Sequence, residues 1–289
     1  MKPVDPSSAA ISPKVSACSF TPAQGEQYGF SIAPVYVSFG EQAYQSGVNL
    51  DAAEFYQLLR TSKDLPTTAQ PTAQDFINLY TRLAKDADKI VTVVISHHMS
   101  ATLQSALMAK EQFTDIPVHV IDSESVTLGL GMMCLAATRA AAEGQDAQQI
   151  IQLLEQIKQN MTVFFTVDTL KYLHKGGRIG GGTAFLGSAL NIKPILYLKE
   201  GRIEPLERQR TRARAIARLL ELIEEKVGAS KTHFAVFHCE AEQAARDFGE
   251  QVQAKFNCAE LIISEAGPVI GTHAGPGTLG LAFYTLPEG

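Results

Sequence analysis

Short runs of apolar residues alternate with longer amphipathic segments along most of the chain. Runs such as Ile90–Ile95 and Val118–Asp122 are typical of strands that are buried on both faces. The segments between them place apolar residues at helical spacing, so strands and helices are predicted to alternate. In the first half we also expect a hairpin of Ile32–Phe39 with a return at Ala43, a helix capped by Asn49 or Asp51, and an extended polar connection at Leu65–Thr72. Further helices are expected at Ala73–Asp86, in the segment that ends at about Phe113, at Leu128–Glu143 and at Asp146–Asn160.

The second half continues this alternation and adds a hairpin signature at Glu200 and Gly201. We expect strands at Ile195–Leu198, Ile203–Leu206, Phe234–His238, Leu261–Ile263 and Leu281–Leu286, and helices at Arg208–Val227 and Ala241–Phe256. The arginines at 208, 210, 212, 214 and 218 are more typical of a solvated helix face than of a site. We therefore predict an α/β protein of two α/β domains, residues 1–160 with a parallel sheet and residues 161–289 with a mixed sheet.

A glycine-rich stretch follows the predicted domain boundary. It opens with the apolar run Val163–Val167, after which Asp168 stands where a helix N-cap is expected. The segment Lys175–Gly182 holds too much glycine for a helix interior, which indicates a loop with Arg178 as the cation inside it. A short helix is expected at Phe185–Leu190. The loop is thus predicted to lie between packed elements and to hold one arginine at a fixed place.

Composition indicates an ordinary soluble protein. The 289 residues are 45% hydrophobic and carry a net charge of −5, with no basic run of the kind that binds nucleic acid. The four cysteines are scattered without paired spacing, which favours reduced thiols. The first residues lack the apolar core of a signal peptide, and no apolar run is long enough to span a membrane. We therefore expect a cytoplasmic protein without membrane insertion.

Several familiar motifs are absent or misplaced. Gly275–Gly280 matches the G-x-G-x-x-G pattern, but only nine residues follow it, and they are expected to form a strand instead of a helix. No phosphate-loop pattern, nucleophile elbow or H-E-x-x-H motif is present. His97 and His98 are adjacent, and no cysteine or carboxylate is spaced to complete a metal site with them. We expect neither a nucleotide site nor a metal.

Small hydroxyl residues follow the predicted strands. In an open α/β sheet, ligands bind beyond the carboxyl ends of the strands. Hydroxyl groups and a histidine there, beside the free N–H groups of helix N-termini, would suit an anionic group such as a carboxylate. Ser100 and Ser123 can also be explained as helix N-caps that need no ligand. The candidates for a head-group site are Thr68, Ser100, Thr102, Ser123, Ser125 and His273.

Several of these segments resemble the DegV family over residues from about 28 to the end. The longest motif is Asp168-Thr-Leu-x-Tyr-Leu-x-Lys-Gly-Gly-Arg-Ile-Gly, followed by Leu-Asn-Ile-Lys-Pro-Ile-Leu. The other matching segments are Ile95-Ser96 with Met99-Ser-Ala-Thr102 and Gln104-Ser-Ala106, Thr68-Ala-Gln-Pro71, Asp122-Ser123 with Gly129-Leu-Gly131, and Gly271-Thr-His273-x-Gly-Pro-Gly277.

The resemblance implies a cytoplasmic bacterial protein of two α/β domains that buries one long-chain fatty acid between them, with no other cofactor. Some family members are the fatty-acid-binding subunit of a two-component fatty acid kinase and present the carboxylate to an ATP-using partner. By this resemblance Thr68, Ser100 and His273 bind the carboxylate and Arg178 meets the kinase subunit. Two positions depart from the family pattern. Ala101 replaces a glycine, and the usual Thr-Asp-Ser of the first strand is reduced to a serine aligned at Ser16.

Fatty acid binding is physically reasonable, because each buried methylene contributes about 0.8 kcal/mol. Two alternatives remain open. One is a serine hydrolase acting on acyl esters, with Ser100 as nucleophile, His273 as base and Asp122 or Asp168 as the orienting carboxylate. The other is a structural role without a ligand. On the fatty-acid hypothesis we expect the loop to display Arg178 outward, so that Arg178→Ala keeps lipid binding and impairs phosphorylation by the partner.

Overall fold

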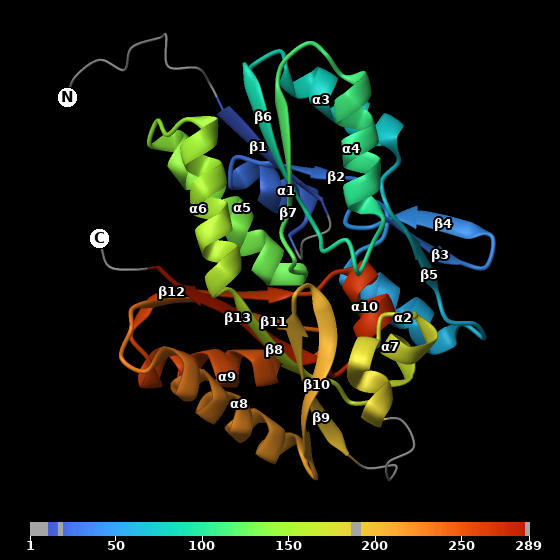
Figure 1. Ribbon diagram of the computed structural model, residues 1–289. Coiled ribbons are helices and arrows are strands. Elements are labelled where there is room, and N and C mark those ends of the chain that lie inside the picture. The colour runs from blue at the N-terminus through green and yellow to red at the C-terminus, as the bar shows by residue number, and fades with distance from the viewer. Residues whose placement is uncertain (1–10, 17–19, 186–191, 287–289) are drawn as a thin grey trace.

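The computed structural model describes residues 11–16, 20–185 and 192–286, with the backbone alone for 11–16. Each half of the chain builds a sheet with helices, and a small third sheet lies beside them (Figure 1). The expectation of an α/β protein with a parallel sheet first and a mixed sheet second is confirmed.

The first sheet is parallel throughout. Its order is β2 (Ser31–Ala33), β1 (Ile11–Ser16), β6 (Lys89–Val94) and β7 (Val118–Asp122). Alternate residues of β6 point to opposite faces. Ile90 and Val94 pack with helices α3 (Ala73–Leu83) and α4 (Thr102–Gln112), whereas Val91 and Val93 face α5 (Thr127–Ala142) and α6 (Ala147–Asn160).

The second sheet has six strands, and among them only β11 and β12 pair in parallel. Its order is β10 (Arg202–Gln209), β9 (Lys193–Lys199), β8 (Thr162–Thr166), β13 (Leu279–Thr285), β11 (Thr232–His238) and β12 (Cys258–Glu265). Helices α8 (Arg212–Val227) and α9 (Glu242–Lys255) cover one face. The other face packs against α5 and α6, so these two helices lie between the two large sheets (Figure 1).

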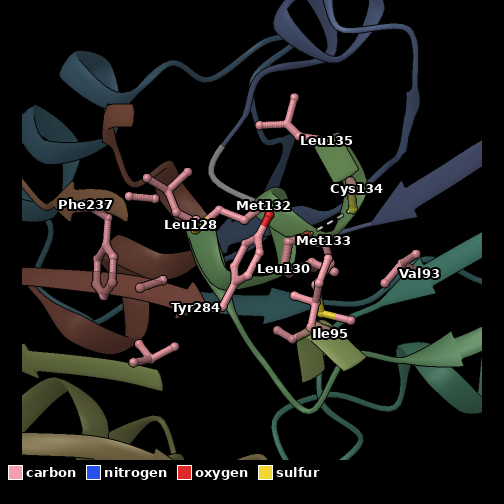
Figure 2. Packing of buried hydrophobic residues seen from close by; sticks show 14 of the residues in the cluster. Val93, Ile95, Leu128, Leu130, Met132, Met133, Cys134, Leu135, Phe237 and Tyr284 are labelled. Carbon is pink, nitrogen blue, oxygen red and sulfur yellow. Dashed lines mark hydrogen bonds between the residues drawn. The ribbon is translucent and has the colours of Figure 1, made fainter. Parts of the chain in front are cut away.

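Helix α5 is the centre of the main core. Eleven of its sixteen residues are buried, which explains its nearly continuous apolar sequence, because a helix that contacts protein on all sides has no polar face. Leu128 and Met132 approach Phe237 and Tyr284 of the second sheet, whereas Met133 lies near Ile95 (Figure 2). Helix α5 therefore joins the two halves through a single apolar core.

The third sheet is antiparallel and consists of β4 (Gln42–Gln45), β3 (Tyr36–Phe39) and β5 (Thr67–Ala69). With α2 (Ala52–Thr61) it packs on α10 (Pro268–Ala274) from the C-terminal half. The expected hairpin between β3 and β4 is confirmed. The expectation of one strand over Ile32–Phe39 is wrong, because Ala33 ends β2 and Tyr36 begins β3 in another sheet.

Three short helices complete the fold: α1 (Pro22–Gln27), α7 (Lys171–Lys175) and the 3₁₀ turn η1 (Gly180–Phe185). Asp51 caps α2 as expected. Asp168 is not an N-cap, because α7 begins at Lys171 and the Asp168 carboxylate instead accepts hydrogen bonds from Lys193 at 2.7 Å and Arg212 at 3.3 Å. The helix expected at Phe185–Leu190 lies largely outside the described residues.

Candidate functional site

A cavity lies where the two halves and the third sheet meet. It encloses about 840 Å³ of space between atoms, the part open to solvent included. Both halves of the chain contribute to its wall, as the resemblance implied. The lining residues are Val35, Thr68, Ala69, Gln70, Ile95, Met99, Ser100, Thr102, Val126, Thr127, Phe165, Leu173, Arg178, Ile203, Phe237, Val269, Ile270, His273, Ala274 and Thr278.

Four predicted residues meet in this wall. Thr68 on β5 and His273 on α10 place Oγ1 and Nε2 2.8 Å apart. Ser100, in the turn after β6, places Oγ 2.8 Å from Oγ1 of Thr102, the first residue of α4. These four residues bring three hydroxyl groups and one imidazole to the cavity, the kinds of group that can bind a carboxylate.

His273 is uncharged at neutral pH. Burial first, and the nearby Arg178 guanidinium second, lower the pKa of His273 to about 4. Its Nδ1 atom is buried and has no hydrogen-bond partner among the described residues. A Cβ atom at position 176 would lie only 2.4 Å from this nitrogen, so the absence of a side chain at Gly176 allows the ring to sit there.

Arg178 also lines the cavity. Its Nε donates to the carbonyl oxygen of Met99 at 3.1 Å and its Nη1 to that of Gly176 at 2.7 Å. The side chain is half-buried and lines the cavity, which the expectation of an outward display of Arg178 did not include, and its contact with a partner stays a prediction. Among the described lining residues it is the only one that carries a permanent charge.

The remaining candidates lie elsewhere. Ser123 and Ser125 are buried and line a separate, polar pocket beside Lys158 and Gly201. The side chain of Ser16 lies outside the described residues. The alternative role as N-caps is also wrong for Ser100 and Ser123, because Ala101 and Val126 occupy the N-cap positions of α4 and α5.

The apolar part of the wall was not predicted from the sequence. It includes Phe165, Ile203 and Phe237, which come from three strands, and Ile95, which directly follows β6. Each belongs to a run that was expected to be a strand, but which side chains line a cavity depends on how two sheets face each other. The register of a single strand holds no signal of that kind.

The geometry of a hydrolase triad is not assembled among the described residues. His273 contacts Thr68, and Ser100 contacts Thr102. Asp122 Oδ2 lies 2.5 Å from His97 Nδ1, and Asp168 pairs with Lys193 and Arg212, so neither carboxylate orients His273. Within the described ranges, no three histidine, cysteine or acidic side chains are grouped to hold a metal ion, and no helix has the length and apolarity to cross a membrane.

Comparisons with known proteins agree with the residue motifs. The profile of a family described as "Uncharacterised protein, DegV family" matches residues 16–286. A DegV domain-containing protein of Halalkalibacterium halodurans is 37% identical over 265 residues, which cover 91% of this chain and 94% of the relative.

Solved structures show the same fold. A DegV family protein from Thermus thermophilus, described as fatty acid binding, superposes with a TM-score of 0.91 at 32% identity, covering 96% of this chain and 100% of the other. DegV of Bacillus subtilis, described as a fatty acid binding protein, superposes with a TM-score of 0.88 at 33% identity, with coverage of 96% and 100%.

Proposed function

Because this chain belongs to the DegV family, we propose that it binds one long-chain fatty acid in the cavity between its two halves. The carboxylate lies at Thr68, Ser100, Thr102 and His273, and the tail lies against the apolar wall. The observation that carries the proposal is the contact between Thr68 and His273, which brings two polar groups from distant segments to one place in a largely apolar cavity.

The two parts of the ligand contribute differently. Each methylene removed from water contributes about 0.8 kcal/mol, so the tail supplies most of the affinity. A buried carboxylate is costly unless it is hydrogen-bonded and its charge is compensated. The hydroxyl groups can donate the hydrogen bonds, and the Arg178 guanidinium, tied to the Met99 carbonyl, supplies a nearby positive charge.

Organic extraction and mass spectrometry of the purified protein test this proposal directly. We expect a co-purifying long-chain acid, and uptake of added palmitate or oleate by delipidated protein. A chain that carries no lipid and takes up neither acid would contradict the proposal.

We further propose that the chain does not act alone but presents the carboxylate to an ATP-using kinase. In that reaction a carboxylate oxygen attacks the γ-phosphorus of ATP, the acyl O–P bond forms, and ADP leaves. The absence of a phosphate-loop pattern in the sequence supports the view that the nucleotide is held by a partner. Arg178 lines the cavity beside the proposed carboxylate site. A partner kinase that reaches the carboxylate would therefore also contact Arg178.

Arg178→Ala separates binding from presentation. We expect the variant to retain its fatty acid, because the tail supplies most of the affinity, and to lose acyl phosphate formation when a partner kinase and ATP are added. Arg246→Ala is the control, since the Arg246 side chain is exposed on the outer side of α9 and pairs with Glu242. If Arg178→Ala instead loses its fatty acid, Arg178 contributes to carboxylate binding, and its proposed role in presentation to the kinase is contradicted.

A further inference from the structure

Two phenylalanines flank a glycine on the cavity side of the second sheet. In the antiparallel pairs of β13, Gly280 lies opposite Phe165 of β8 and opposite Phe237 of β11. Residues directly opposite each other on neighbouring strands point to the same face. Both phenylalanines line the cavity and belong to the core that surrounds α5.

The ring of Phe237 occupies the space that a side chain at position 280 would take. A Cβ atom built on Gly280 would lie 2.3 Å from Cζ of Phe237 and 2.6 Å from Cβ of Phe165. The two ring centroids are 6.5 Å apart. Because residue 280 has no side chain, the Phe237 ring can pack directly against the backbone of β13. The same ring forms part of the cavity wall.

Beyond the row formed by Phe165, Gly280 and Phe237, the next row across the same strands has smaller side chains. The next residues on the same face are Ala235, Ala282 and Val163, which pair across the same three strands. Leu128 and Met132 of α5 belong to the core on this side of the sheet, and Figure 2 shows Leu128 near Phe237 and Met132 near Tyr284. Methionine is flexible and adapts to irregular space. The Phe237 ring thus separates the cavity from a part of the core whose side chains are small or adaptable.

We propose that Phe237 determines how long an acyl chain the cavity accepts. This inference rests on the proposed fatty acid function and goes beyond it, because it names the residue against which the tail ends. Replacing the ring with a smaller side chain frees the volume that the ring occupies beside Gly280, next to Ala235 and Ala282, and the methylenes of a longer acid can then be buried there.

The test compares Phe237→Leu and Phe237→Ala with the wild type over lauric, myristic, palmitic, stearic and arachidic acids. We expect the preferred length to move to longer acids. For each two-carbon step that finds new room, the affinity should rise roughly fifteenfold, since each methylene contributes about 0.8 kcal/mol. Phe234→Leu is the matched control, because Phe234 is fully buried on the same strand but faces α8 and α9.

A substitution at the glycine tests the same idea in the opposite direction. Gly280→Ala would push the Phe237 ring into the cavity and shift the preference toward shorter acids, and Phe237→Ala in the same chain should restore longer ones. A wild type that binds these acids, with the same length ranking in both Phe237 variants, would overturn this inference alone. A wild type that binds none of them would overturn the proposed function as well.

Discussion

Thr68 Oγ1 and His273 Nε2 lie 2.8 Å apart although 205 residues separate them in the chain. The contact joins β5 of the small sheet to α10, and β3, which pairs with β5, packs on α10 through the apolar cluster that contains Val37 and Ala274. Packing of the third sheet on the C-terminal half therefore sets the geometry of the proposed head-group site. Substitutions at either residue should act on ligand binding more than on the fold.

Thr68→Val removes the hydroxyl and keeps the shape of the side chain. Hydrogen bonds to charged groups contribute about 1.5–3 kcal/mol, so we expect palmitate affinity to fall by roughly tenfold to a hundredfold. Thr67→Val is the control, because Thr67 is exposed on the same strand and does not line the cavity. Calorimetric titration of delipidated protein measures both. Equal losses in the two variants would remove Thr68 from the head-group site.

His273 should make stability depend on pH in the weakly acidic range. Its pKa is about 4 in the folded chain and about 6.5 when unfolded. Between these values the unfolded chain binds a proton that the folded chain does not, so the free energy of unfolding falls as the pH drops from about 6.5 to about 4. The shift corresponds to about 3 kcal/mol at most.

The difference between wild type and His273→Asn isolates this contribution from the other histidines. Urea unfolding of both proteins, delipidated, should show a loss in the wild type on going from pH 7 to pH 4.5 that is larger by about 1–3 kcal/mol than in the variant. Parallel pH profiles for the two proteins would mean that His273 is charged or exposed in solution.

Gly176→Ala should disturb the head-group site through His273. The new methyl group would lie 2.4 Å from His273 Nδ1, so the imidazole must move away from Thr68 or the loop must shift. We expect palmitate affinity to fall by at least about tenfold, as for the loss of one hydrogen bond to a charged group. A double-mutant cycle with His273→Ala gives the control, because Gly176→Ala should then cost little further affinity. Additive losses would place the effect elsewhere in the loop.

The sequence predicted the sheets better than it predicted the site. The apolar runs at Ile90–Ile95 and Val118–Asp122 became neighbouring parallel strands, because continuous apolar runs suit strands covered by helices on both faces. The rule that ligands bind beyond strand ends located Ser100 correctly in the cavity wall but also selected Ser123. Gly201 of the β9–β10 turn packs close to that second strand end, because a Cβ atom there would lie 3.3 Å from Cα of Glu124, the residue after Ser123.

Contacts between distant segments account for the failures. Thr68 was expected in an extended polar connection without a partner strand, and its place on β5 depends on pairing with β3. Asp168 was expected to cap a helix, but Lys193 and Arg212 neutralise its charge instead. Neither partner is close in sequence. Local patterns therefore predicted the elements, whereas the side chains that meet at the cavity were set by tertiary packing.

A polar network on the outer end of α5 should also stabilise the link between the two halves. Arg139 of α5 donates two hydrogen bonds to Glu260 of β12, each 2.8 Å long, and His233 Nδ1 lies 2.8 Å from Glu260 Oε1. The hydrogen bond with His233 first, and that with Arg139 second, lower the pKa of Glu260 to about 2. His233 in turn stacks on Tyr284, with ring centroids 4.7 Å apart.

Glu260→Gln should weaken this link at neutral pH and have no effect in strong acid. Because the folded pKa of Glu260 is depressed, its stabilisation is present above the unfolded value of 4.5 and is lost as the pH falls toward 2. We expect the variant to lose about 1–2 kcal/mol of unfolding free energy at pH 7, less than the full shift implies because Arg139 is partly exposed to solvent. Glu224→Gln, which breaks an exposed pair with Lys255, should cost less than about 0.5 kcal/mol. Urea unfolding of the wild type and of Glu260→Gln, each at pH 7 and near pH 2, measures the free energies of unfolding. If the difference between the two proteins is as large in acid as at pH 7, the charge of Glu260 contributes nothing to stability.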